Sequence, residues 1–118
     1  MHGTWVNLDP PRRLTDWERR VVERLSPQAT EEAIEGLRVI DHCGCGCASV
    51  GFANVAHVPV GEAEAADSDG ELSWVMLFAD REEQILATLD VIRPDGRPIR
   101  ELPNVDQLSI VKTSAWSS

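Results

Sequence analysis

Residues 73–93 read SWVMLFADREEQILATLDVIR, two apolar runs joined by a polar tetrapeptide. The first run, 73–80, is apolar at odd and even positions alike, as is typical of a strand that is covered on both faces or lies at the centre of a sheet. The second run, 85–93, alternates more loosely, and residues 81–84 have the length of a hairpin connection. The stretch therefore predicts a β-hairpin within an antiparallel sheet.

Three further segments read as strands, at residues 37–42, 48–58 and 105–112. Residues 94–96, Pro-Asp-Gly, predict a turn after the hairpin, because proline presets φ and glycine accepts a positive φ. We therefore expect a mostly antiparallel sheet of about four to five strands.

Two short helices are expected before the strands. Residues 15–18, TDWE, fit a capping box in which Thr15 and Glu18 exchange hydrogen bonds. An apolar stripe at helical spacing follows, formed by Trp17, Val21, Val22 and Leu25. Ser26 and Pro27 are expected to end this helix and to begin a second one, with Ser26 as its N-cap, Pro27 at its first helical position and Gly36 as its stop. Helices first and strands after predict an α+β domain with two N-terminal helices packed on the sheet.

The chain of 118 residues is expected to form a single domain, 1–118. Residues 1–13 are expected to be loosely ordered. Residues 61–73, GEAEAADSDGELS, carry five acidic side chains and no basic one, which predicts an acidic, solvated loop. The spacing of Asp67 and Asp69 in this stretch lacks the remaining ligands of an EF-hand.

The charge is strongly acidic, with 20 Asp and Glu against 11 Lys and Arg and a formal net charge of −9. This balance argues against binding to nucleic acid, which needs a basic face, and against attraction to an anionic membrane. The first residues, MHGTWVNLDPPRRL, lack the apolar core of a signal peptide, and the three cysteines do not form a framework of the secreted kind. A cytoplasmic protein is the expectation.

Residues 41–47, DHCGCGC, are the one place where reactive side chains crowd together. In an extended strand Cys43 and Cys47 would lie about 13 Å apart, too far to share one zinc ion. In a hairpin over residues 44–46 they would face each other with Cβ atoms roughly 5 Å apart, near the range of a disulfide or a shared metal. The geometry thus depends on the turn.

Three hypotheses stay open for Cys43, Cys45 and Cys47: buried structural residues, a metal site with zinc as the candidate ion, and a redox disulfide. The structural role is favoured, because the spacing is neither the C-x₂₋₄-C of zinc sites nor the C-x-x-C of thiol oxidoreductases. No cofactor is therefore expected, with zinc as the alternative. His57 is the best candidate for a base beside a thiol.

The stretch Cys43-Gly44-Cys45-Gly46-Cys47-Ala48-Ser49-Val50, after a helix that begins near Leu14, resembles a group of small, acidic, uncharacterised bacterial proteins common in actinobacteria. In that group a C-x-C-G-C-x-S-V stretch follows a helical region, and a strand with D-G and proline comes later, here residues 89–98. Proline is frequent in the group where this chain has Ala48. The group has no assigned activity, so the resemblance carries over no functional residue.

No catalytic residue is assigned, because the chain lacks G-x-S-x-G, H-E-x-x-H and a phosphate-binding glycine loop, and its carboxylates form no recognisable pair. We expect a non-enzymatic binding or interaction protein whose acidic surface meets a basic protein partner. The alternative is a thiol-based metal or redox protein, and a small Cys–His hydrolase or transferase is least favoured. The tryptophans are most simply packing anchors, but an exposed one would indicate a partner surface.

Overall fold

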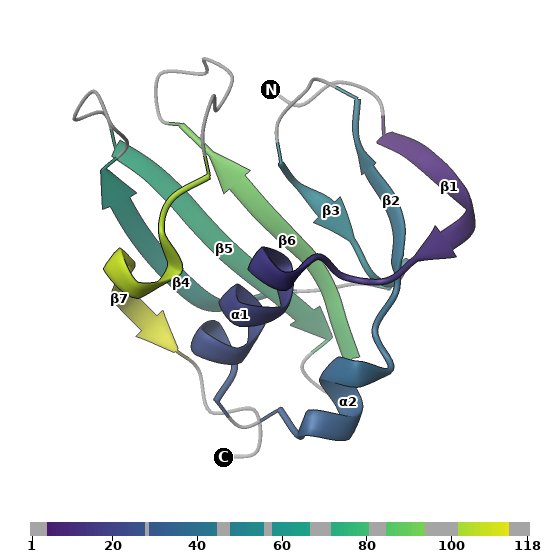
Figure 1. Cartoon of the computed structure of the whole chain (residues 1–118), viewed down its shortest axis with the longest axis horizontal. Helices are drawn as coiled ribbons and strands as arrows, with labels where there is room; N and C mark the ends of the chain where they lie inside the picture. The colour runs from purple at the N-terminus through teal and green to yellow at the C-terminus, as the bar shows by residue number, and fades with distance from the viewer. Residues whose placement is uncertain are drawn as a thin grey trace.

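The structure, a computed structural model, describes residues 5–27, 29–44, 48–55, 58–66, 72–80, 85–93 and 102–113. Within these ranges, seven strands form one antiparallel sheet and two α-helices accompany it (Figure 1). The expected α+β class with two helices and an antiparallel sheet is confirmed. The expected count of four to five strands is wrong, because residues 5–12 and 58–66 form two further strands that the sequence signals only weakly.

The strands in chain order are β1 (Trp5–Arg12), β2 (Val39–Cys43), β3 (Val50–Gly51), β4 (Val58–Ala66), β5 (Leu72–Asp80), β6 (Ile85–Ile92) and β7 (Ser109–Thr113). Helices α1 (Asp16–Leu25) and α2 (Glu31–Glu35) precede β2, and the 3₁₀ helix η1 (Val105–Gln107) precedes β7. The order across the sheet is β1-β2-β3-β6-β5-β4-β7, and all neighbouring strands are antiparallel.

The predicted hairpin is confirmed as β5 and β6, with Val75 opposite Val91 and Leu77 opposite Leu89. Strand β5 lies inside the sheet, between β6 and β4. Its two faces differ, since Val75 and Leu77 are fully buried whereas Trp74 is 40% exposed. The continuous apolar run thus reflects a place inside the sheet rather than cover on both faces.

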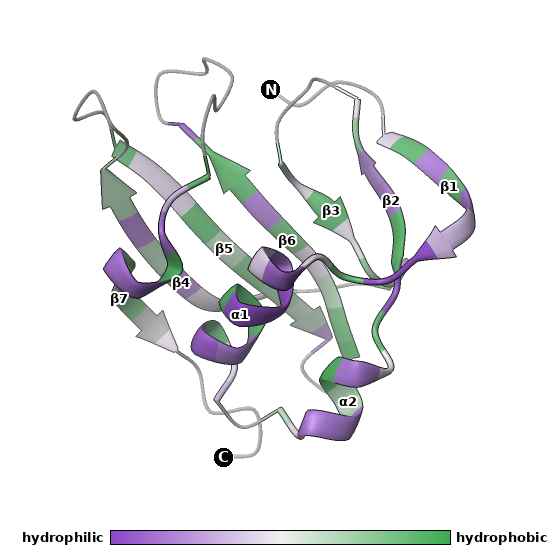
Figure 2. Cartoon of the chain, in the orientation of Figure 1, coloured by the Kyte–Doolittle hydropathy of each residue, from purple (hydrophilic) through white to green (hydrophobic). Residues whose placement is uncertain are grey.

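Helix α1 covers one face of the sheet (Figure 1). Its capping box is present, and Val21, Val22 and Leu25 are completely buried in the core, as the apolar stripe predicts. Figure 2 shows the helices largely hydrophilic in colour and the central strands largely hydrophobic. Burying such aliphatic side chains contributes roughly 1.5–3 kcal/mol each. Trp17 also ties α1 to the segment before η1, as its Nε1–H donates to Pro103 O at 2.7 Å.

The second helix begins later than expected. Its N-cap is Thr30, whose Oγ1 accepts a hydrogen bond from the Ala33 N–H at 3.1 Å, and not Ser26. The expected end of the first helix at Ser26 is confirmed, because the Ser26 N–H donates to Val22 O at the C-cap of α1. The expected N-cap at Ser26 is wrong, since α2 begins after Thr30, which is also a typical N-cap residue.

Residues 5–12 correct the expectation of a loosely ordered N-terminal segment. They form the edge strand β1, in which Trp5 pairs with Cys43 and Asn7 with Asp41. Two prolines lie in β1, and proline is tolerated at a sheet edge because one row of N–H groups there needs no partner. The residues of β2 that pair with β1 lie 27 to 38 positions further along the chain, so no local pattern indicated the strand.

The expected acidic loop at 61–73 is also corrected. Residues 58–66 form β4, which pairs with β5 on one side and β7 on the other. Glu62 and Glu64 alternate with Ala63 and Ala65, which are buried under α1. Alanine and glutamate alternate in this stretch with the period of two that is typical of a strand. The sequence did not predict the strand, because alanine is a poor strand former and the charges favoured a solvated loop. Residues 67–71, with Asp67 and Asp69, lie outside the described residues.

The predicted strand over 48–58 is shorter in the structure. Within the described residues 48–55, only Val50–Gly51 is a strand, β3, which pairs with β2 and β6, and Val58 begins β4. The chain then leaves the sheet, and the N–H groups of Phe52 and Ala53 both donate to Ala87 O. These two hydrogen bonds to one carbonyl oxygen replace the regular pairing between strands, and β3 therefore ends at Gly51.

Helix α1 approaches β4 so closely that only glycine fits below it. A Cβ at Gly61 would lie 2.6 Å from Leu25 O and 2.9 Å from Leu25 Cβ. Real Cβ atoms do not come this close to backbone atoms, so any larger residue would push helix and sheet apart.

Gly61→Ala is therefore expected to lower the free energy of unfolding by about 1–3 kcal/mol, as overpacking does. The matched control is Gly36→Ala at the end of α2, where φ is −77° and a Cβ would meet nothing closer than 3.5 Å. That variant is expected to gain roughly 0.4–1 kcal/mol through lost unfolded-state entropy. Urea unfolding of both measures this, and equal stability of the two would contradict the close packing.

A buried carboxylate links β1 to α1. Glu18, 5% exposed, accepts hydrogen bonds of 2.9 Å from both terminal nitrogens of Arg12 and one of 2.8 Å from the Thr15 N–H. Burial alone would raise the pKa of Glu18, but the hydrogen bonds from Arg12 and Thr15 and the charge of Arg12 outweigh it. The pKa of Glu18 is therefore lowered from its ordinary value of 4.5.

Because the pKa of Glu18 is lower in the folded state, its contribution to stability is present above about pH 4.5 and is lost as the pH falls through the folded value. Glu18→Gln keeps the capping geometry and removes the charge. We expect it to lower the free energy of unfolding by about 1–2 kcal/mol at neutral pH, a value that is limited because solvent partly screens the charge of Arg12.

Urea unfolding between neutral pH and pH 3 checks this expectation about Glu18. The cost of Glu18→Gln should shrink with falling pH, whereas Glu23→Gln, at an exposed pair of 3.8 Å with Arg19, should cost little at any pH. A cost for Glu18→Gln that does not depend on pH would contradict the role of the ion pair.

Candidate functional site

The face of the sheet turned away from α1 gathers carboxylates and exposed apolar side chains. Side chains alternate along a strand, so the neighbours of residues buried under α1 lie on this opposite side. We call this side the open face. On strands β2 to β6 it comprises Asp41, Gly51, Glu62, Glu64, Leu72, Trp74, Met76, Phe78, Thr88, Asp90 and Ile92.

Two cross-strand rows show how charge and apolar surface alternate on the open face. In one row Glu64, Trp74 and Ile92 are neighbours, and in the next row Glu62, Met76 and Asp90 are neighbours. Trp74 is 40% exposed and Leu72 is 38% exposed. We expected an exposed tryptophan to indicate a partner surface, and Trp74 is such a residue.

The arginines near α1 lie on the other side of the sheet. Arg19 forms ion pairs with Glu23 and Glu35, and Arg20 donates to Asp106 Oδ1 at 3.0 Å. Arg12 is bound to Glu18, as described above. These arginines are paired with carboxylates of the same side, whereas the residues named above for the open face include four carboxylates and no basic side chain.

A cavity of about 580 Å³ opens beside the short strand β3. It is lined by Trp5, Asn7, Ile40, Asp41, Gly51, Ala53, Asn54, Val55, Thr88 and Asp90. We call it the Asp41 pocket. The register places Asn7, Asp41, Gly51 and Thr88 in one row across four strands, so the pocket is part of the open face.

Glycine at position 51 determines where the carboxylate of Asp41 lies. A Cβ built on Gly51 would be 1.9 Å from Asp41 Oδ1 and 3.0 Å from its Cγ. The carboxylate thus occupies the space over β3 that a side chain at position 51 would fill. The missing side chain of Gly51 lets Asp41 reach from β2 across the floor of the pocket.

The described lining residues of the Asp41 pocket include two carboxylates and no basic side chain. Asn7, Asn54 and Thr88 add amide and hydroxyl oxygens, and Trp5 adds an aromatic wall. Such a set accepts hydrogen bonds from a positively charged donor, and the indole can attract a cation. The volume lies in the range of about 300–1,000 Å³ that ligand pockets have.

Sequence reasoning found neither Asp41 nor Asp90 as members of one site. The two residues are 49 positions apart, and each is the one acidic residue of its strand, VIDHC and ILATLDVI. A single carboxylate within a strand was the available signal. Only the pairing of β3 with both β2 and β6 brings them to one pocket.

The end of β2 pairs with the segment that follows the cysteine stretch. The Cys43 N–H donates to Ser49 O at 3.1 Å, and the register pairs His42 with Val50 and Asp41 with Gly51. Ser49 therefore lies opposite Cys43, the position that the hairpin over residues 44–46 would give to Cys47. Residues 45–47 themselves lie outside the described residues.

Cys43 is 2% exposed and lies at the end of β2. Cys45, Cys47 and His57 lie outside the described residues, so the structural, metal and redox hypotheses for the cluster all stay predictions. Among the residues that the structure describes, no three His, Cys, Asp or Glu side chains are grouped so that they could hold a metal ion.

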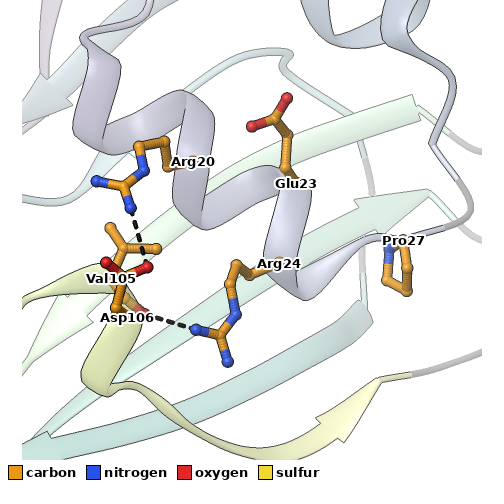
Figure 3. Close-up of a pocket in the computed structure, with 6 residues that line it drawn as sticks. All are labelled: Arg20, Glu23, Arg24, Pro27, Val105 and Asp106. Atoms are coloured by element: carbon orange, nitrogen blue, oxygen red, sulfur yellow. Dashed lines mark hydrogen bonds and ion pairs between the residues drawn. The ribbon is translucent and has the colours of Figure 1, made fainter.

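A second cavity, of about 420 Å³, lies between α1 and η1 and contains Arg20 and Arg24 (Figure 3). Arg24 donates to Val105 O at 2.8 Å and to Leu108 O at 3.3 Å, while Arg20 reaches Asp106. These arginines already bind groups of the chain itself. We therefore assign this cavity a structural role, the attachment of η1 and β7 to α1.

Arg24→Gln is expected to lower the free energy of unfolding by about 1–2 kcal/mol, because two carbonyls at the helix interface lose a charged donor. Arg20→Gln is the matched control, since its pair with Asp106 is 44% and 75% exposed, and should stay within about 0.5 kcal/mol. Thermal or urea unfolding measures both. A larger loss for Arg20→Gln would contradict the assignment.

Comparison with known proteins adds no relative: no family model matches the chain, and no curated protein or solved structure matches it significantly. The resemblance to small acidic bacterial proteins therefore stays a prediction. Among the described residues, no helix combines the length and the apolar character that crossing a bilayer requires.

Proposed function

We propose that this protein is a non-enzymatic binding module whose open face receives a basic protein partner. The observation that carries the proposal is the separation of charge across the sheet. The described carboxylates of β2, β4 and β6 lie beside exposed apolar residues on the open face, while the arginines around α1 are paired on the other side.

The composition of the open face fits association with a protein rather than with a small molecule alone. Trp74 and Leu72 offer apolar area at the start of β5, and tryptophan is among the residue types most enriched at dominant interface contacts. Glu62 and Glu64 border this area and favour a partner with complementary charge. The net charge of −9 would speed the encounter at low salt.

A labelled oligoarginine peptide tests the open face with a defined probe. Glu62→Gln/Glu64→Gln is expected to weaken its binding about tenfold in fluorescence anisotropy at low salt, because two bordering carboxylates are lost. Glu31→Gln/Glu32→Gln removes the same charge from the exposed first turn of α2 and should weaken binding less than about threefold.

Trp74→Ala provides the apolar arm of the same experiment and is expected to weaken peptide binding without changing the net charge. Circular dichroism of each variant checks that the fold is kept. If Glu62→Gln/Glu64→Gln and Glu31→Gln/Glu32→Gln weakened peptide binding equally, the peptide would be attracted only by the net charge of the protein. That result would contradict the open face as the binding surface.

A further inference from the structure

We infer that the Asp41 pocket is the anchor point of this surface and binds the guanidinium group of an arginine side chain of the basic partner. The inference rests on the proposed function and makes it specific to one side chain. It is carried by the cavity, by the two carboxylates Asp41 and Asp90, and by the aromatic wall of Trp5.

The donor pattern of a guanidinium matches the acceptors of the pocket. A guanidinium presents five N–H donors in a plane, whereas an ammonium presents three around a point. The pocket offers acceptors on several sides: carboxylates on β2 and β6, the amide of Asn7 on β1, and the amide of Asn54 after β3. A planar ion can also stack on the indole of Trp5, which a compact ammonium does less well.

The position of the Asp41 carboxylate adds pre-organisation. It lies in the space left by Gly51, where a Cβ would be only 1.9 Å from Oδ1. A carboxylate held at the pocket floor before binding needs little reordering when the cation arrives, which lowers the entropic cost of association. Ile40 and Val55 also line the cavity and offer apolar contact to the methylene groups of an arginine side chain.

The volume of the pocket is suited to a single side chain of a partner. Its volume of about 580 Å³ holds an amino-acid side chain with some water, and it is continuous with the open face through Thr88 and Asp90. A partner that lies on the open face could thus place one arginine in the pocket while its neighbouring residues contact Trp74.

The test uses N-acetyl-arginine amide, with the neutral isostere N-acetyl-citrulline amide as the matched ligand control. Titration of the full chain is followed by two-dimensional NMR of backbone amides and indole N–H groups. We expect saturable shifts at Asp41, Gly51 and the Trp5 indole, with an affinity at least about tenfold better for the arginine derivative.

Two variants separate the pocket from general electrostatics. Gly51→Ala keeps the net charge and is expected to weaken binding about tenfold, because its Cβ displaces the Asp41 carboxylate, the end of a side chain that can move. Asp41→Asn should weaken binding by a similar factor. Glu62→Gln removes the same charge on the open face outside the pocket and should change the affinity less than about threefold.

Several outcomes would overturn the inference: equal binding of the citrulline derivative, equal binding of N-acetyl-lysine amide, loss of affinity in Glu62→Gln as large as in Asp41→Asn, or displacement of the arginine derivative by stoichiometric Ca²⁺ or Mg²⁺. Retained affinity in both Gly51→Ala and Asp41→Asn would also overturn it.

The oligoarginine experiment distinguishes failure of the inference from failure of the proposed function. Peptide binding that is lost in Glu62→Gln/Glu64→Gln but unaffected by Gly51→Ala and Asp41→Asn would leave the open face as the binding surface and remove the pocket as its anchor. Saturable arginine binding in the pocket without peptide binding to the open face would overturn the proposed function instead.

Discussion

The contact between Leu25 and Gly61 is the constraint on which the arrangement of layers depends. Helix α1 lies against β4 at a distance that leaves no room for a Cβ, and three of its aliphatic side chains fill the core on that side. The 10 residues of α1 rise about 15 Å, whereas seven strands at about 4.8 Å spacing span about 29 Å. One short helix thus packs on one side of a wide sheet.

This layering gives the opposite face its chemistry through the simple alternation of strand side chains. Each alanine or valine buried under α1 requires its neighbours on the strand to point the other way, and on β4 and β6 those neighbours include Glu62, Glu64 and Asp90. The charged residues therefore need no special positioning. They are the outer half of the pattern that builds the core.

The Asp41 pocket arises where the sheet changes its partners. Strand β3 has only two residues, and it joins the β1-β2 pair to the β4-β5-β6 meander. Because Gly51 is one of those two residues, the carboxylate of Asp41 can lie over the strand instead of beside a neighbouring side chain. The pocket at this join thus results from a local gap in side-chain cover.

Much of the local structure could be read from the sequence. The capping box at Thr15 and Glu18, the apolar stripe of α1 and the β5-β6 hairpin depend on residues that are close in the chain, and periodicity and caps report such contacts directly. The edge strand β1, the strand character of residues 58–66 and the partner of Cys43 could not be read in this way. Each is decided by pairing with a distant segment, which outweighs the weak strand propensity of proline, alanine and glutamate.

The sequence by itself determined the α+β class, the acidic charge and the inner and outer faces of α1, because composition and short-range spacing encode them. Only the tertiary structure decided which carboxylates share a pocket and which face of the sheet stays open. Asp41 and Asp90 meet because β3 pairs with both of their strands, and the open face exists because α1 packs on the other one.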